Sequence, residues 1–304
     1  MDLATLGLIT YVVWVFWLSK CFTSALSSSF DFARSRSLME SVVVKVASLI
    51  MLIYDYLLTL DLEVKLIWKA DWNLGKFLFL LTRYLPFFDT AVVLYYQFSP
   101  VHTSRQCEIA YQYSAWMFVV GMTIAELLLT IRTWAVWEKD IRLGVALSIL
   151  YAGFLVAEYV AVGLYLKSLT HEVSPLQPLV TCFVSNMNRL LSICWIVLMA
   201  YDAVIFTLIA IQAIRTFRLW GNVPLLRVIY QDGIIYFAYL FGLSFLNAII
   251  ILKLPLEYVN LLSLMERIAH ALLTCRIILH IRELDARNTR PREIEEIALM
   301  DLTA

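Results

Sequence analysis

Charged residues are scarce in this sequence of 304 residues. Asp, Glu, Lys and Arg make up 16% of it and hydrophobic residues 62%, whereas a soluble domain has about 25% charged and about 45–50% apolar residues. The mean hydropathy of +0.78 points the same way. The composition therefore excludes an ordinary soluble domain, and the absence of a low-complexity linker favours one integral membrane domain.

The sequence also lacks an excess of either charge. It has 24 Lys and Arg against 24 Asp and Glu, so nothing in it is suited to neutralising the phosphates of a nucleic acid. It has no phosphate-binding glycine loop, no Gly-x-Ser-x-Gly elbow and no Asn-x-Ser/Thr acceptor. Its four histidines are scattered, so we expect no metal site and no cofactor.

Seven stretches have the roughly 20 mostly apolar residues that a membrane helix needs. They predict an all-α membrane protein, a bundle of seven transmembrane helices within residues 41–283. Before it lies an N-terminal extension, 1–40, whose apolar run fits a signal peptide without a basic start, an eighth span or an interfacial segment. After it lies a tail, 284–304. The predicted spans are 41–60, 76–97, 112–134, 143–166, 190–213, 230–252 and 257–281.

Lys and Arg are unevenly distributed among the short connections between these spans. The connections after spans one, three and five are rich in them, as is the tail, and the opposite connections are poorer. Because Lys and Arg favour the cytoplasmic side, we expect the N-terminus outside and the C-terminus in the cytoplasm, although Lys20, Arg34 and Arg36 give a contrary signal. This topology resembles that of a seven-helix receptor, and we expect a multi-pass protein of the plasma membrane.

Two of the five cysteines fall on the predicted outer side, where disulfides persist. Cys107 comes just before span three, and Cys182 lies in the connection before span five. Rhodopsin-like receptors pair the same two places, and this resemblance implies a Cys107–Cys182 bridge. The alternative is two free thiols.

Several stretches are similar to a family of seven-helix membrane proteins of mushroom-forming fungi, catalogued as a domain of unknown function. The longest are LIYDYLLTLDLEVKLIW and LGKFLFLLTRYLPFFDT near the start of the predicted bundle. LLTIRTWAVW, LLRVIYQDGIIYF and LTCRIILHIRE follow the pattern further along, so that the resemblance covers about 43–283. It implies a receptor-like fold, but no settled activity.

Ionisable side chains inside the spans are candidates for function, because each costs roughly 3 kcal/mol or more in a membrane. Asp55 in span one, Asp89 in span two and Glu126 in span three are expected to face the interior as one polar network. The alternative is a structural acid, hydrogen-bonded to a neighbouring helix. Arg83, nearer the cytoplasmic end, is expected to snorkel to the lipid headgroups.

Polar and aromatic groups of later spans are candidates for binding a ligand. Glu266 and His270 lie one turn apart on a polar stripe of span seven and can pair directly. The alternatives are polar contacts that hold helices together and, for the aromatic residues, a belt at the membrane interface. The ligand-binding candidates are Tyr113, Trp116, Glu158, Asp202, Ser263, Glu266 and His270.

Three arginines at predicted cytoplasmic ends are candidates for contact with a partner. Arg132 ends span three, where rhodopsin-like receptors place a functional arginine, although its neighbours here differ. Arg215 and Arg218 follow span five. The alternative for Arg132 is a contact with lipid phosphates.

Three functions agree with this sequence. The first is a receptor-like signalling protein that binds a small apolar ligand and couples to a cytoplasmic partner such as a G protein. The second is an intramembrane enzyme that acts on a lipid or isoprenoid through buried carboxylates. The third is a channel or transporter. An enzyme needs acids that converge on one atom. The acids are expected at different depths, which favours the receptor.

Overall fold

Long helices make up almost all of the computed structural model, which describes the backbone of residues 30–98, 104–173, 182–186, 190–220, 224–253 and 263–303. Within these ranges the predicted all-α fold is confirmed, and a long helix corresponds to each of the seven predicted spans. The helices are α2 (Phe30–Glu63), α3 (Leu74–Phe98), α4 (Ser104–Val136), α5 (Ile141–Lys167), α6 (Leu191–Trp220), α7 (Pro224–Lys253) and α8 (Ser263–Thr303).

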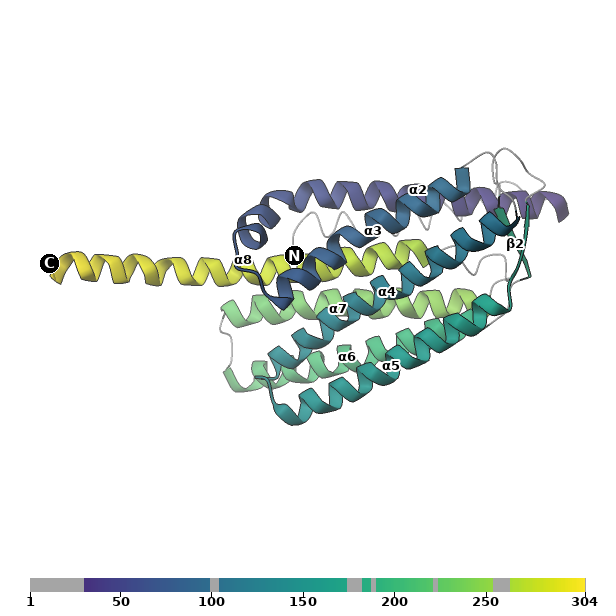
Figure 1. The fold of residues 1–304 in the computed structure, drawn as a ribbon. Coiled ribbons are helices and arrows are strands. Elements are labelled where there is room, and N and C mark those ends of the chain that lie inside the picture. The colour runs from purple at the N-terminus through teal and green to yellow at the C-terminus, as the bar shows by residue number, and fades with distance from the viewer. Residues whose placement is uncertain are drawn as a thin grey trace.

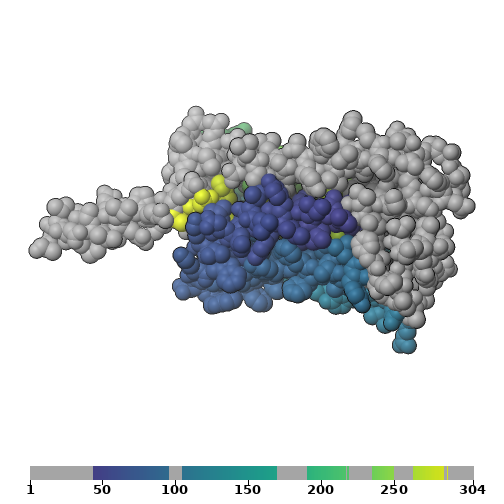
Figure 2. Space-filling view, turned by 90° about the horizontal axis from the view of Figure 1, so that it is seen from above, coloured from purple at the N-terminus to yellow at the C-terminus, as the bar shows by residue number. Residues whose placement is uncertain are grey.

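Helix α8 lies inside the bundle formed by the others. It contacts α2, α3, α4 and α7, and Figure 1 shows it in yellow between α2 and α3 on one side and α7 on the other. Every residue from 264 to 277 is buried. Of the enclosed part of α8, only a small yellow patch appears beside α2 and α3 in the space-filling view of Figure 2. Helix α8, although its buried segment carries several ionisable residues, is therefore the most enclosed of the described helices.

Four of the helices in the described part of the chain are long and apolar enough to cross a membrane. They are the segments Leu74–Tyr95, Arg105–Val136, Ile141–Lys167 and Leu191–Thr216. Helix α5 leaves Ile149, Val156 and Val160 more than half exposed along its length. Soluble monomers rarely expose a continuous apolar face of this kind. These features indicate a multi-pass membrane protein.

Short, ordered turns connect two of the helix pairs. A π-helical turn, η1 (Val64–Trp68), ends α2, and Asn73 Oδ1 accepts the backbone N–H of Lys76 at 2.8 Å to cap the start of α3. The turn before α5 places Glu138 and Lys139 at positive φ, and Asp140 then caps α5. Because both connections are short, α2 and α3, and likewise α4 and α5, run antiparallel beside each other.

A small antiparallel hairpin lies between α5 and α6, with strands β1 (Thr170–Val173) and β2 (Cys182–Asn186). Both strands contact α4. Cys107, near the start of α4, is buried and is not among the free cysteines. Cys182 begins β2, but its side chain lies outside the described residues, so the pairing of Cys107 with Cys182 stays a prediction.

Both ends of the bundle differ from the simple division into extension, bundle and tail. Helix α2 already begins at Phe30, so residues 30–40 continue into the first predicted span. The apolar run interpreted as a signal peptide, an eighth span or an interfacial segment lies outside the described residues. Helix α8 continues without interruption to Thr303 and leaves the bundle as a single extended helix (Figure 1).

Candidate functional site

The central helix α8 makes polar contacts with each of the helices around it. Arg276 reaches α2, and Arg267 reaches α3. His270 lies between α4 and α6, and Glu266 accepts a hydrogen bond from α7. These contacts form two clusters of buried charged groups, one near the C-terminal end of α2 and one around His270, and a separate ion pair of Arg267.

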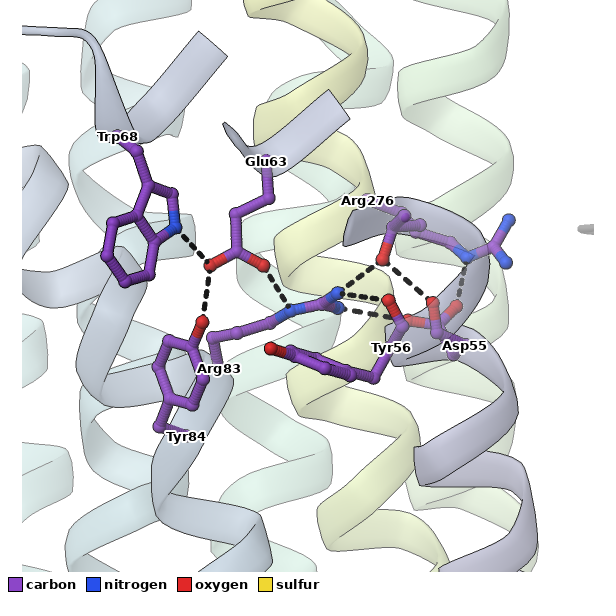
Figure 3. Close-up of polar contacts among 8 residues, drawn as sticks. Asp55, Tyr56, Glu63, Trp68, Arg83, Tyr84 and Arg276 are labelled. Atoms are coloured by element: carbon purple, nitrogen blue, oxygen red, sulfur yellow. Dashed lines mark hydrogen bonds and ion pairs between the residues drawn. The ribbon is translucent and has the colours of Figure 1, made fainter. Parts of the chain in front are cut away.

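The first cluster, called here the arginine lock, consists of Asp55 and Glu63 of α2, Arg83 of α3 and Arg276 of α8 (Figure 3). The Arg83 guanidinium bridges the two acids, with Nη1 at 3.1 Å from Asp55 Oδ2 and Nε at 3.1 Å from Glu63 Oε2. Arg276 Nε lies 2.5 Å from the other oxygen of Asp55. Two carboxylates and two guanidinium groups balance in charge, so the lock removes four ionised groups from water without net charge.

Aromatic side chains and a hydroxyl complete the lock. Glu63 Oε1 accepts hydrogen bonds from the Tyr84 hydroxyl at 2.7 Å and from the Trp68 indole N–H at 3.0 Å. Arg83 also donates to the Thr59 hydroxyl, and its guanidinium lies 5.1 Å from the centre of the Tyr56 ring. A buried charge is stable only when such bonds replace its lost hydration.

The order of residues in α2 and α3 explains why the lock forms. Asp55, Thr59 and Glu63 follow one another at intervals of four residues, which places them on one helical face. The short turn after α2 brings Arg83 of the antiparallel α3 alongside this face. The prediction that Arg83 snorkels to the headgroups is wrong: it is 2% exposed. Two acids within reach favour an inward position.

The second cluster, called here the His270 cluster, joins Glu126 of α4, Asp202 of α6 and Glu266 and His270 of α8. His270 Nδ1 lies 3.1 Å from Glu126 Oε1, while Nε2 lies 3.9 Å from Asp202 Oδ2 and 4.0 Å from Glu266 Oε1. All four side chains are at most 5% exposed. The predicted approach of Glu266 and His270 is confirmed, but His270 also brings in acids from two other helices.

Two polar residues of α7 hold the acids of this cluster. Ser244 donates a hydrogen bond of 2.5 Å to Asp202 Oδ2 and lies 3.5 Å from His270 Nε2. Asn247 donates to Glu266 Oε2. By contrast, both oxygens of Glu126 and Nδ1 of His270 are buried without a hydrogen-bond partner among the described residues. Although only 3.1 Å apart, the two groups are not aligned as donor and acceptor.

A separate ion pair, Arg267 with Asp89, lies beside this cluster. Arg267 Nη2 is 3.3 Å from Asp89 Oδ2, and the Arg267 side chain is completely buried. The guanidinium packs against the backbone of α4 at Gly121, where any Cβ would overlap it. Gly121 is therefore the position that admits a full-length arginine into the interior.

The three acids predicted to form one network lie in three different places. Asp55 belongs to the arginine lock, Asp89 pairs with Arg267, and Glu126 belongs to the His270 cluster. The prediction of a single network of Asp55, Asp89 and Glu126 is therefore wrong. The reason is that an arginine or histidine of another helix stands opposite each acid.

The remaining predicted residues are not among the contacts that define the two clusters. Glu158 is buried on α5 beside Cys194, and Ser263 is half-buried at the start of α8. Tyr113 and Trp116 are 47% and 36% exposed on the outside of α4, and Trp116 packs against Tyr159 at 5.9 Å between ring centres. These positions agree better with an interface belt than with a pocket.

The arginines predicted to contact a partner lie near helix ends. Arg132 is half-buried near the C-terminal end of α4, whereas Arg215 and Arg218 are exposed near the end of α6. Arg215 stacks on Trp137, with 5.2 Å from its guanidinium to the ring centre.

Sequence reasoning missed several residues of the clusters. Glu63 and Arg276 were assigned no role, although Glu63 repeats the helical face of Asp55 and so carried a signal. The sequence carried no signal for Ser244, Asn247 or Gly121. Small and polar residues are common in membrane helices, and their role depends on the side chains that face them in the folded protein.

Comparison with known proteins identifies one segment that is similar to a known family. Residues 43–88 match a family of unknown function (DUF6533). No curated protein matches the chain. The matched segment contains Asp55, Glu63 and Arg83 of the lock, together with Tyr84. It supports the resemblance noted in the sequence over α2 and the first part of α3. The resemblance further along the chain stays a prediction.

Replacing Arg83 by methionine leaves Asp55 and Glu63 buried without the guanidinium between them. Because removal of one partner of a buried ion pair costs about 3–5 kcal/mol, we expect Arg83→Met to lower the melting temperature clearly in detergent, as followed by thiol-reactive fluorescence. The matched control is Lys65→Met. It breaks the pair between Lys65 and Asp61, which are 62% and 74% exposed, and is expected to change little. Equal melting of Arg83→Met and the wild type would contradict the lock.

The position of Gly121 yields a second prediction. Gly121→Ala places a methyl group where the Arg267 guanidinium lies, and we expect a loss of about 1–3 kcal/mol because the buried arginine has little room to move. Gly153→Ala is the control, since nothing lies within 4 Å of a Cβ there and alanine favours the helix by up to about 1 kcal/mol. If both variants melt alike, Arg267 is not confined by Gly121.

Proposed function

We propose that the protein is a receptor-like seven-helix membrane protein that couples a small, apolar ligand to a cytoplasmic partner such as a heterotrimeric G protein. The observation that carries the proposal is the position of α8. Its polar groups contact α2, α3, α4, α6 and α7 inside the bundle, and its C-terminal part extends outside it (Figure 1). A ligand that displaces any of these neighbours must also act on α8.

Buried ion pairs suit such a mechanism because they favour discrete arrangements over gradual ones. If a neighbouring helix shifts, the ion pair of Arg83 or Arg267 either stays intact or breaks, and breaking it costs considerable free energy. A ligand acts on this balance only if it binds the two arrangements with different affinity. The proposed contacts of a ligand that enters from the outer end remain Glu158, Asp202, Ser263, Glu266 and His270.

The distribution of positive charge supports an orientation with the N-terminus outside and the C-terminus in the cytoplasm. The C-terminal ends of α2, α4 and α6 lie at the end of the bundle from which α8 extends (Figure 1). Exposed Lys65, Lys139, Arg142, Arg215 and Arg218 lie at or beside these ends. Because Lys and Arg favour the cytoplasmic face, this end is proposed to face the cytoplasm, with the plasma membrane as the location.

Coupling is testable at the end of α6. Arg215→Ala combined with Arg218→Ala removes two exposed cations at the end of the bundle from which α8 extends. We expect nucleotide exchange on a heterotrimeric G protein to fall by about fivefold or more. The assay uses the purified full chain in lipid nanodiscs, with a panel of sterols, free fatty acids and isoprenoid alcohols as probes. Arg105→Ala, an exposed arginine at the opposite end, is the matched control and should leave exchange unchanged.

Exchange that no probe raises above the level of protein-free nanodiscs would count against the receptor. So would equal losses in the Arg215/Arg218 variant and in Arg105→Ala, because the effect would then not depend on the cytoplasmic end.

The proposal includes the bridge between Cys107 and Cys182, which would hold the β1–β2 hairpin against α4. We expect an alkylating reagent to label Cys107 of the unfolded wild type only after reduction, because a bridged sulfur does not react. In Cys182→Ser the same residue should be labelled without reduction, as detected by peptide mass spectrometry. Cys194→Ser, which removes a free cysteine, is the control. Labelling of Cys107 in the unreduced wild type would exclude the bridge.

A second candidate, an intramembrane enzyme acting on a lipid or isoprenoid, is favoured by one specific observation. Glu126 and Asp202 converge on His270, as an acid and a base must to reach one substrate atom. The expectation that the acids lie at separate depths is thus not met for this pair. Conversion of a probe lipid by the purified protein, without any effect on nucleotide exchange, would favour the enzyme over the receptor.

A further inference from the structure

The His270 cluster contains side chains of the kinds that bind metal ions, contributed by three helices. One ligand atom each from Glu126 of α4, Asp202 of α6 and His270 of α8 lies within 4.8 Å of the other two. The sequence predicted no metal site, because its histidines are scattered. Two of the three ligating groups are acids from distant parts of the sequence, and only the folded bundle brings them to His270.

The hydrogen bonding of the cluster leaves the ligating atoms available. Neither oxygen of Glu126 nor Nδ1 of His270 has a hydrogen-bond partner of normal geometry among the described residues. Both side chains are completely buried, and the Glu126 carboxyl lies close to that of Asp202. Buried polar atoms normally find a partner, and an orphaned one in a native structure calls for an explanation such as an ion. Glu266 Oε1, 4.0 Å from His270 Nε2, is likewise unpartnered.

The balance of acidic and basic groups in the His270 cluster also favours a bound cation. Glu126, Asp202 and Glu266 surround His270, whereas the nearby Arg267 is paired with its own acid, Asp89. The arginine lock is electrically balanced, but this cluster has three carboxyl groups and one imidazole. No arginine or lysine of the described residues forms an ion pair with this cluster, so a divalent cation would offset the excess of acid.

We propose that Glu126, Asp202 and His270 bind a divalent first-row transition metal ion, with zinc the best match. An imidazole with carboxylates suits zinc, iron or nickel, whereas magnesium and calcium prefer oxygen ligands alone. Tetrahedral ligands at about 2.0–2.1 Å from zinc lie about 3.4 Å apart. His270 Nδ1 and Glu126 Oε1 are already 3.1 Å apart, so modest side-chain rotations that adjust the separations within the present 4.8 Å would complete the site. The ion would tie α4, α6 and α8 together. This inference does not rest on the proposed receptor function.

The surroundings match those of a metal site. The Ser244 hydroxyl donates to Asp202 Oδ2 at 2.5 Å and so fixes the orientation of one carboxylate, as outer hydrogen bonds do around metal ligands. Three protein ligands leave one position of a tetrahedral ion for water or for a polar group of a ligand. Glu266, which accepts a hydrogen bond from Asn247, has its other oxygen 4.0 Å from His270 Nε2.

The first test is the metal content of the full chain, purified with a tag that contains no histidine and without chelators. We expect about one zinc ion per chain by inductively coupled plasma mass spectrometry. Asp202→Asn and His270→Gln should each lower the content about tenfold or more. Glu158→Gln is the matched control, because this buried acid of α5 is not one of the three ligating residues, and it should keep its zinc.

The second measurement uses the wild type alone, so that a variant that fails to fold does not decide the matter. After treatment with a chelator, added zinc should raise the melting temperature by about 5 °C or more, and added cobalt should give the visible absorption of a tetrahedral site. No metal in the purified protein and no response to zinc, manganese or cobalt would overturn the proposal. So would stabilisation by sodium, magnesium or calcium only, or equal loss of zinc in Glu158→Gln.

Discussion

A charged side chain inside a membrane bundle must find its partner in the bundle, and α8 supplies most of those partners here. In water each of these groups would be hydrated, whereas lipid offers neither donors nor acceptors. The enclosed segment of α8 therefore carries Arg267, His270 and Arg276 towards acids on the helices around it. The positions of α2, α3, α4 and α6 must allow these contacts. The packing of the bundle and the pairing of its charged groups therefore depend on each other.

The two buried clusters compensate their charged groups in different ways. In the arginine lock, each acid meets a guanidinium and the charges balance, with aromatic hydroxyl and indole groups satisfying the remaining lone pairs. In the His270 cluster, acids outnumber cations and several atoms lack partners. The first arrangement is typical of structural support, and three of its four charged residues, Asp55, Glu63 and Arg83, lie within the segment that matches a family of unknown function. The second has unused binding capacity, which is more typical of a functional site.

The fold was largely predictable, and the clusters were not. The apolar stretches located the seven helices because span length follows from bilayer thickness. Hydropathy was a poorer guide for α8, because it counts charged residues without regard to the direction in which their side chains point. Asp55 was correctly expected to face inward from its helical face, but its partner Arg276 lies 221 residues away. Glu126 and His270 are similarly distant in sequence, so no local pattern joins them.

The sequence by itself determined that this is a helical membrane protein with ionisable groups inside its spans, because composition and span length depend on each segment alone. Only the tertiary structure decided which acid meets which cation. That choice depends on the rotation and depth of helices relative to one another, and on details as small as the missing side chain of Gly121, which admits Arg267. Ion pairs form between residues that are close in space, whereas the sequence shows directly only which residues are close along the chain.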